Sequence, residues 1–177
     1  MWKFLLLVIV PFNMLHSQEF TPKEEKRIKS ILKRSSSSVR TLNKSSLISV
    51  EKLMNSEVEA LVENALFSAG FQVVSNKVAK EAILISNPLS QSNENIEVSK
   101  KTTFKSVYVV TVACNIYEGS VIGRTCGGYL RSFTARIVDL SNEGKLVGVF
   151  KFSGSLECIE DVSNAFAYSI LSLGNKN

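Results

Sequence analysis

The sequence is poor in the residues that most often carry catalysis. It holds a single histidine, His16, and its only two aspartates are Asp139 and Asp161. His16 lies in a segment that we expect to be removed, which would leave no side chain whose unperturbed pKa lies near neutrality. A hydrolase with a histidine base and histidine-ligated metal sites are therefore excluded. We expect no enzyme, no cofactor and no metal site.

The sequence also has no apolar run as long as a membrane-spanning helix. Its longest apolar stretch is short and lies at the N-terminus. Lys3 precedes an apolar run over 4–10, which continues loosely to Leu15 with interruptions at Pro11 and Asn13. Ser17 offers a small residue for cleavage. This order is typical of a secretory signal peptide, whereas a membrane-spanning helix needs about 20 apolar residues. We predict that 1–17 is a signal peptide, that the mature chain has no membrane span, and that it reaches the periplasm, the outer membrane or the cell surface.

The charge balance points to no polyanionic partner. The formal net charge is +5, which is ordinary for a soluble protein of this length, and export makes nucleic acid an unsuitable partner. The mature chain of about 160 residues suits one domain with its own core. We divide it into a basic N-terminal helix with a Ser-rich joint over 18–45 and a single α/β domain over 46–174.

The basic segment 22–34 has the signals of a helix. Thr21 and Glu24 form a capping box around Pro22, and the acids precede the bases as the helix dipole favours. Its narrow apolar stripe predicts packing on the domain, and a peripheral contact with an anionic membrane is the alternative. The serines of 35–38 predict a flexible joint.

Hydrophobic periodicity in the rest of the chain predicts an α/β domain with a mixed sheet. The order is β-α-β-α-β-β-β-α, ending in a long antiparallel meander and a closing helix. Glycine or proline ends each of the three helices, and the polar run 89–103 predicts an exposed loop. The expected strands are 47–50, 71–75, 104–117, 129–140 and 145–153, and the expected helices are 56–69, 77–85 and 161–173.

Three stretches of this pattern resemble a domain of bacterial envelope proteins. They are LISVEKLMNSEVEALVENALFSAGFQVVS, the hairpin FTARIVDLSNEGKLVGVFKFSG and the closing EDVSNAFAYSILSL. The group includes the curli-secretion channel lipoprotein, the outer-membrane activators of penicillin-binding proteins and the N-terminal domain of TolB. The resemblance covers about 130 residues, roughly 46–174, on the scale of one domain. It implies a non-enzymatic envelope protein that works through contacts with other proteins. The lipid-attachment cysteine of the lipoprotein members is missing.

Two of the three cysteines flank a glycine-bearing turn. With the turn centred on Ser120, Cys114 and Cys126 would face each other across a hairpin, within reach of a disulfide. Pairing with Cys158 and three reduced thiols remain open alternatives, since sequence does not fix connectivity. A zinc or redox site is disfavoured because the chain has no C-x-x-C pair.

The same region holds the candidate contact residues. Arg124, Tyr129 and Arg131 could form a small partner-binding edge beside the glycines. We expect an envelope protein or a second copy as the partner, in an assembly, scaffold or activator role. The alternative is a small-ligand or glycan-binding protein that uses the 87–103 loop and the Tyr117/Tyr129 neighbourhood. An enzyme built on Glu157 and Glu160 is the least favoured hypothesis.

Overall fold

A computed structural model describes residues 20–39, 42–51, 56–86, 106–117 and 128–172. It shows helices packed on a six-stranded mixed sheet, so the predicted α/β class is confirmed. The strand order is β1-β6-β5-β4-β2-β3, with β2 parallel to β3 and β4 and the other neighbours antiparallel. The predicted order of strands and helices is found, and α1 and β1 precede it. The strands are β1 (Ser35–Ser37), β2 (Leu47–Glu51), β3 (Gln72–Val73), β4 (Val107–Tyr117), β5 (Tyr129–Asp139) and β6 (Lys145–Cys158).

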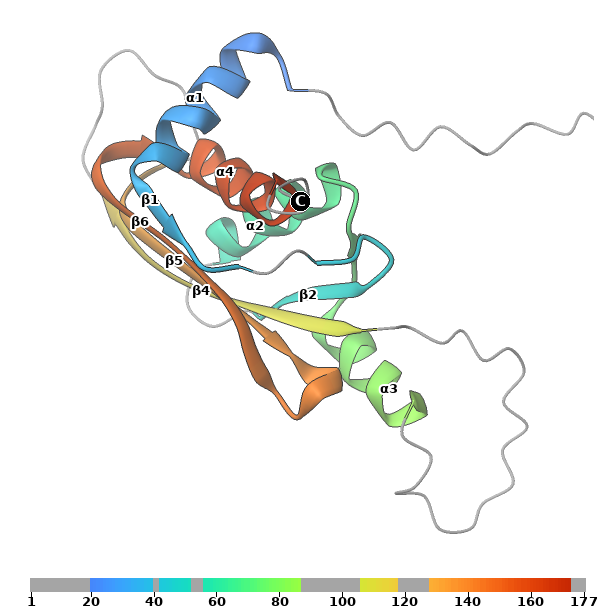
Figure 1. Cartoon of the computed structure of the whole chain (residues 1–177). Helices are drawn as coiled ribbons and strands as arrows, with labels where there is room; N and C mark the ends of the chain where they lie inside the picture. Colours follow the sequence, from blue (N-terminus) through green and yellow to red (C-terminus); the bar gives the residue numbers. More distant parts are fainter. Residues whose placement is uncertain (1–19, 40–41, 52–55, 87–105, 118–127, 173–177) are drawn as a thin grey trace, which may run out of the picture.

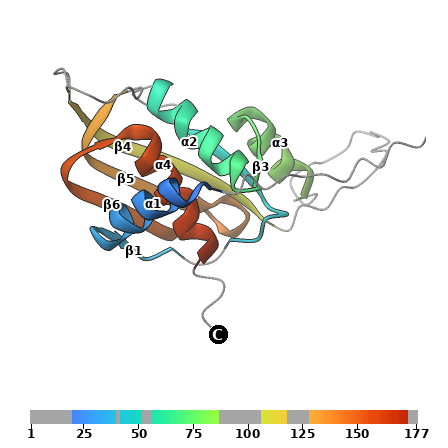
Figure 2. The same cartoon turned by 90° about the horizontal axis from the view of Figure 1, so that it is seen from above.

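Three helices cover one face of the sheet, and the fourth lies on the other face (Figures 1 and 2). The helices are α1 (Pro22–Lys33), α2 (Ser56–Ser68), α3 (Asn76–Ser86) and α4 (Ile159–Ser172). Helix α4 lies between α1 and α2 and contacts both. Helix α3 packs on Leu47 and Val107, whereas Ile48 and Val110, an odd number of residues further along the same strands, belong to the main core. Because side chains alternate across a strand, α3 lies on the opposite face from the other three helices.

The main core lies between the sheet and α4. Phe133 and Phe150 reach it from neighbouring strands, and Phe166 reaches it from the helix. Their ring centroids are 5.7–6.1 Å apart, in tilted and edge-on arrangements that aromatic rings favour. This cluster fixes which face of the sheet is buried.

The N-terminal segment belongs to the same core. The predicted capping box is present: the Glu24 N–H donates to the Thr21 hydroxyl, and the Thr21 N–H donates to the Glu24 carboxylate at 2.8 Å. Ile28 and Ile31 are each 1% exposed, so the prediction that the apolar stripe packs on the domain is confirmed.

The serine segment is not the flexible joint that we predicted. Ser35–Ser37 forms edge strand β1, paired antiparallel with β6, and the following Val39 lies on Gly148. A Cβ at Gly148 would come within 2.7 Å of the Val39 Cα, so glycine permits this close approach of two backbones. Pairing with β6 therefore supplies the order that serine-rich sequence alone does not indicate.

The last two elements also begin or end differently from our expectation. Strand β6 continues to Cys158, and α4 begins at Ile159. Asp161 therefore lies in the first turn of the helix and does not cap it. There its carboxylate lies 3.6 Å from the guanidinium of Arg27 on α1.

Candidate binding surface

The sheet face opposite α1, α2 and α4 is left largely uncovered by the helices of the described part of the chain. Helix α3 covers it only beside β2 and β4. Over β4, β5 and β6, strand alternation places there a set of side chains that is mostly polar or charged, with one alanine and one valine. They are Ala113, Asn115, Ser132, Thr134, Arg136, Val149, Lys151 and Ser153. We call these residues, together with β1, the open face.

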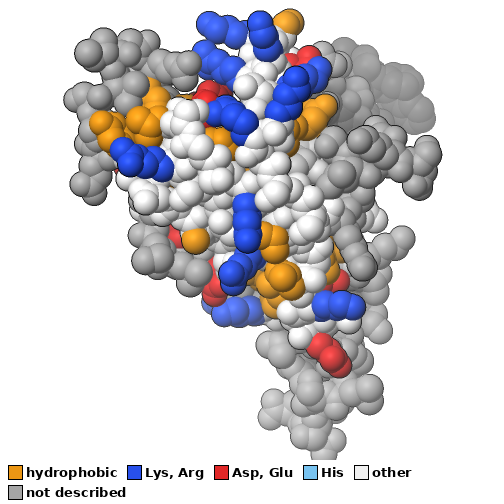
Figure 3. Space-filling view, turned by 60° about the vertical axis from the view of Figure 1, so that its left-hand side comes forward, with side chains coloured by type: hydrophobic (Ala, Val, Ile, Leu, Met, Phe, Trp, Pro, Cys, Tyr) orange, Lys and Arg blue, Asp and Glu red, His pale blue; other side chains and the backbone are white. Residues whose placement is uncertain are grey.

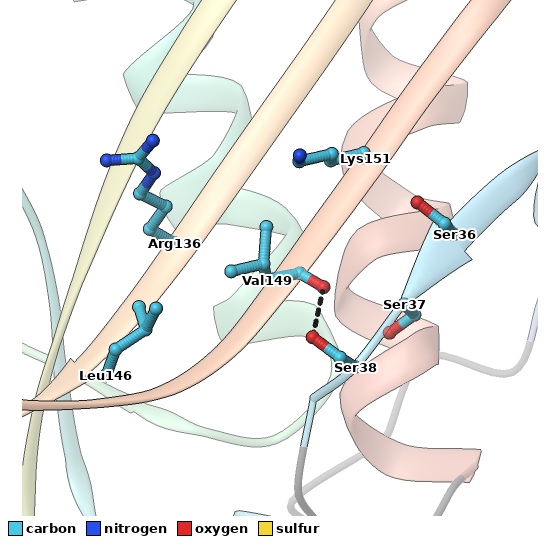
Figure 4. A pocket seen from close by; sticks show the side chains of 7 residues that line it. All are labelled: Ser36, Ser37, Ser38, Arg136, Leu146, Val149 and Lys151. Atoms are coloured by element: carbon cyan, nitrogen blue, oxygen red, sulfur yellow. Dashed lines mark hydrogen bonds between the residues drawn. The ribbon is translucent and has the colours of Figure 1, made fainter.

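A groove of about 560 Å³ lies on the open face along the β1 edge (Figure 4). Its lining comes from β5, from β6 and from the N-terminal segment. Ser36 pairs with Lys151 across the β1–β6 ladder, and Val149 pairs with Arg136 across the β6–β5 ladder. Three segments that are far apart in the sequence thus meet at one site. The groove is lined by Ser36, Ser37, Ser38, Arg136, Leu146, Val149 and Lys151.

Both cations of the groove lack an anionic partner among the described residues. The side chains of Arg136 and Lys151 are exposed and form no ion pair or hydrogen bond with any of those residues. Figure 3 shows Lys and Arg side chains standing out from this side of the molecule, from α1 at the top to the β5–β6 hairpin at the bottom. The groove therefore combines positive charge, hydroxyl groups and an aliphatic patch.

Several cations of helix α1 and its end, in contrast, are bound to the protein itself. The Lys29 ammonium lies 2.7 Å from Glu25, and the Arg34 guanidinium lies 2.6 Å from Glu157 on β6. With its apolar stripe buried, α1 has no apolar face to insert into a membrane. A peripheral contact through 22–34 would have to use solvent-facing lysines alone. None of the described helices is long and apolar enough to cross a bilayer.

The predicted partner-binding edge is only partly at the surface. Arg131 is exposed, and its guanidinium stacks on the ring of Tyr117 at 5.4 Å, a favourable cation–π contact. Tyr129 is 7% exposed and stands opposite Cys158, so it is a core residue. Arg124 lies outside the described residues. The sequence thus indicated one exposed residue of this edge, and it missed the groove, which β1 completes.

The cysteine residues do not have the register that we expected. Phe133, and not Cys126, stands opposite Cys114 in the β4–β5 ladder, so a turn centred on Ser120 is wrong. Cys114 is a half-buried free thiol. Its pKa is raised, mainly because the thiol is buried and to a smaller extent because the charge of Glu59 lies nearby. Cys126 lies outside the described residues, and its disulfide with Cys114 is not shown.

The alternative ligand site and the least favoured catalytic pair find little support in the described residues. A second hollow of about 280 Å³ lies where α1, α2 and α4 meet, and Glu24 and Glu160 line it. Tyr117 and Tyr129 line neither hollow, and the 87–103 loop lies outside the described residues. Glu157 forms an ion pair with Arg34, and it is not among the residues given for the hollow that Glu160 lines.

Comparison with known proteins assigns no function. No family model matches the chain, and no curated protein matches it. Among solved structures, the chain is similar to a PelC dodecamer from Paraburkholderia phytofirmans, with 15% sequence identity and a TM-score of 0.44. The match covers 77% of this chain and 96% of that chain. At this level it identifies no shared activity, and it does not show membership of the envelope group that the sequence pattern resembles.

Proposed function

We propose that the protein is exported and acts without catalysis, by binding another protein through its open face. The observation that carries the proposal is the pair of cations, Arg136 and Lys151, which are exposed in a groove and have no partner among the residues that the structure describes. Surface cations are normally solvated and common. Here, however, they lie in a hollow on a sheet face that helices leave uncovered, while cations of α1 such as Lys29 are paired locally.

The N-terminal pattern and the composition support the other parts of the proposal. The leader-like segment directs the chain out of the cytoplasm. Without it, the chain has no histidine to serve as a general base at neutral pH. Contact with a partner in the periplasm or at the cell surface is the function that fits both observations, with the partner either an envelope protein or a second copy.

Site-specific photo-crosslinking in the producing cells tests this function. A photoreactive phenylalanine analogue replaces Ala113, which is exposed on β4 within the open face, or Asn64, which is exposed on α2 across the molecule. We expect a discrete adduct from position 113 and none from position 64. An adduct of twice the protein's mass would identify a second copy as the partner. No adduct at 113, or equal adducts at both positions, would contradict the proposal.

A further inference from the structure

We infer that the groove on the open face receives an extended acidic segment of a polypeptide. This inference rests on the proposed function and names the chemistry of the partner. In it, a carboxylate of the partner lies between Arg136 and Lys151, and the partner's backbone runs along the β1 edge of the sheet. Each part of the assignment follows from a different feature of the groove.

The spacing of the two cations suits one carboxylate. Arg136 stands opposite Val149, and Lys151 is two residues further along the same strand, on the same face. Such diagonal neighbours are about 7–8 Å apart at the backbone, within reach of long side chains. A guanidinium and an ammonium at this distance can both donate to a carboxylate placed between them. None of the described residues that line the groove is acidic, so in this inference the partner supplies the negative charge.

The free edge of the sheet favours a polypeptide as the source of that charge. Among the strands that the structure describes, β1 is the last on its side of the sheet. The Ser38 N–H donates to the Val149 carbonyl at 2.9 Å. Ser38 and Val149 are therefore a hydrogen-bonded pair of the antiparallel ladder, which determines the direction of the backbone groups of the neighbouring residues. In an antiparallel pair the intervening residue, Ser37, directs its own N–H and C=O away from β6. A polypeptide can pair with such an edge through its backbone, whereas a glycan or a lipid cannot.

The remaining lining residues agree with this choice. Leu146 is 53% exposed beside Val149, an aliphatic patch suited to an apolar side chain near the carboxylate. The lining residues that the structure describes include no aromatic side chain that could stack on a sugar ring. Anionic membranes are typically bound by clusters of about four to eight cations, and this groove contains two. An acidic and aliphatic peptide is thus the best match.

Fluorescence anisotropy with a labelled peptide tests the inference. The probe is a fluorescein-labelled octapeptide of alternating glutamate and valine, and the protein is the purified mature chain. We expect the peptide to bind, and the Arg136→Ala/Lys151→Ala variant to bind it about tenfold more weakly or worse, because the charge pairs are lost. Lys23→Ala/Lys26→Ala removes the same charge from solvent-facing positions of α1 and should leave binding unchanged. Circular dichroism confirms that both variants fold.

Competing probes identify the source of the negative charge. Tighter binding of polygalacturonate or of phosphatidylglycerol vesicles than of the peptide would overturn the inference, as would equal weakening by both double variants.

A peptide methylated on alternate backbone nitrogens should bind more weakly, and unchanged binding would refute pairing with the β1 edge.

The two proposals can fail separately. A position-113 adduct without peptide binding would refute the acidic partner and leave the proposed function intact. Peptide binding without any adduct in cells would refute the proposed function.

Discussion

Replacing Phe166 with alanine should lower the free energy of unfolding by about 3–5 kcal/mol, the usual loss for a large aromatic side chain removed from a core. Phe166 is fully buried, and its ring centroid lies 6.1 Å from that of Phe133 and 5.7 Å from that of Phe150. Truncation leaves a cavity where helix α4 meets β5 and β6. In urea denaturation, the midpoint should fall while the slope stays unchanged.

A matched phenylalanine on the surface serves as the control. Phe67 on α2 is 70% exposed, so Phe67→Ala should change the free energy of unfolding by less than about 0.5 kcal/mol. If Phe166→Ala leaves too little folded protein to measure, Phe166→Leu should still cost up to about 1.5 kcal/mol. Equal losses from the Phe67 and Phe166 truncations would mean that α4 does not close the core as described.

Replacing Ile31 with alanine should cost about 2–5 kcal/mol, even though Ile31 lies in a segment that the sequence separates from the domain. The side chain is 1% exposed and lies in the main core. Its loss should also weaken the anchoring of β1, which starts at Ser35 and forms one wall of the groove. Thermal and urea unfolding of the variant measure the effect.

Ser30→Ala is the control on the same helix. Ser30 is exposed, and alanine is at least as good a helix former as serine, so this variant should be close to wild type. Equal free energies of unfolding for Ile31→Ala and Ser30→Ala would mean that helix α1 does not contribute to the core. They would also contradict the packing of α1 that holds β1 at the groove.

Much of the fold can be predicted from the sequence because its signals are local. The capping box of Thr21 and Glu24 is found as predicted, and Gly70, with φ of +88°, ends helix α2 as expected. The alternation of apolar and polar residues in β5 agrees with the burial of Phe133, Ala135 and Ile137 in the core. Each of these predictions depends on neighbours within a few residues.

What the sequence misses depends on partners distant along the chain. Serines such as Ser36 have no apolar alternation, and β1 forms only because β6 pairs with it. The position of Cys114 opposite Phe133 likewise follows from a register that the glycine-rich turn did not reveal.

The candidate site could not be assembled from the sequence for the same reason. Alternation along β5 is a local signal that is consistent with Arg136 on the outer face of its strand. No local sequence signal predicts that Ser36, Ser37 and Ser38 line the same groove as this arginine. Arg131, in contrast, follows the glycine pair 127–128 closely in the sequence, which is a local signal. The groove depends on β1, which lies at the edge of the sheet and forms one of its walls.

Lysine reactivity in the native protein tests the open-face account most directly. Acetylation followed by mass spectrometry compares Lys151, on the open face, with Lys26, exposed on α1, in purified mature protein and in the intact envelope of producing cells. The account predicts that both lysines react in the purified protein, and that Lys151 alone is protected in the envelope, where a partner covers it. Equal labelling of Lys151 in the two samples would contradict it.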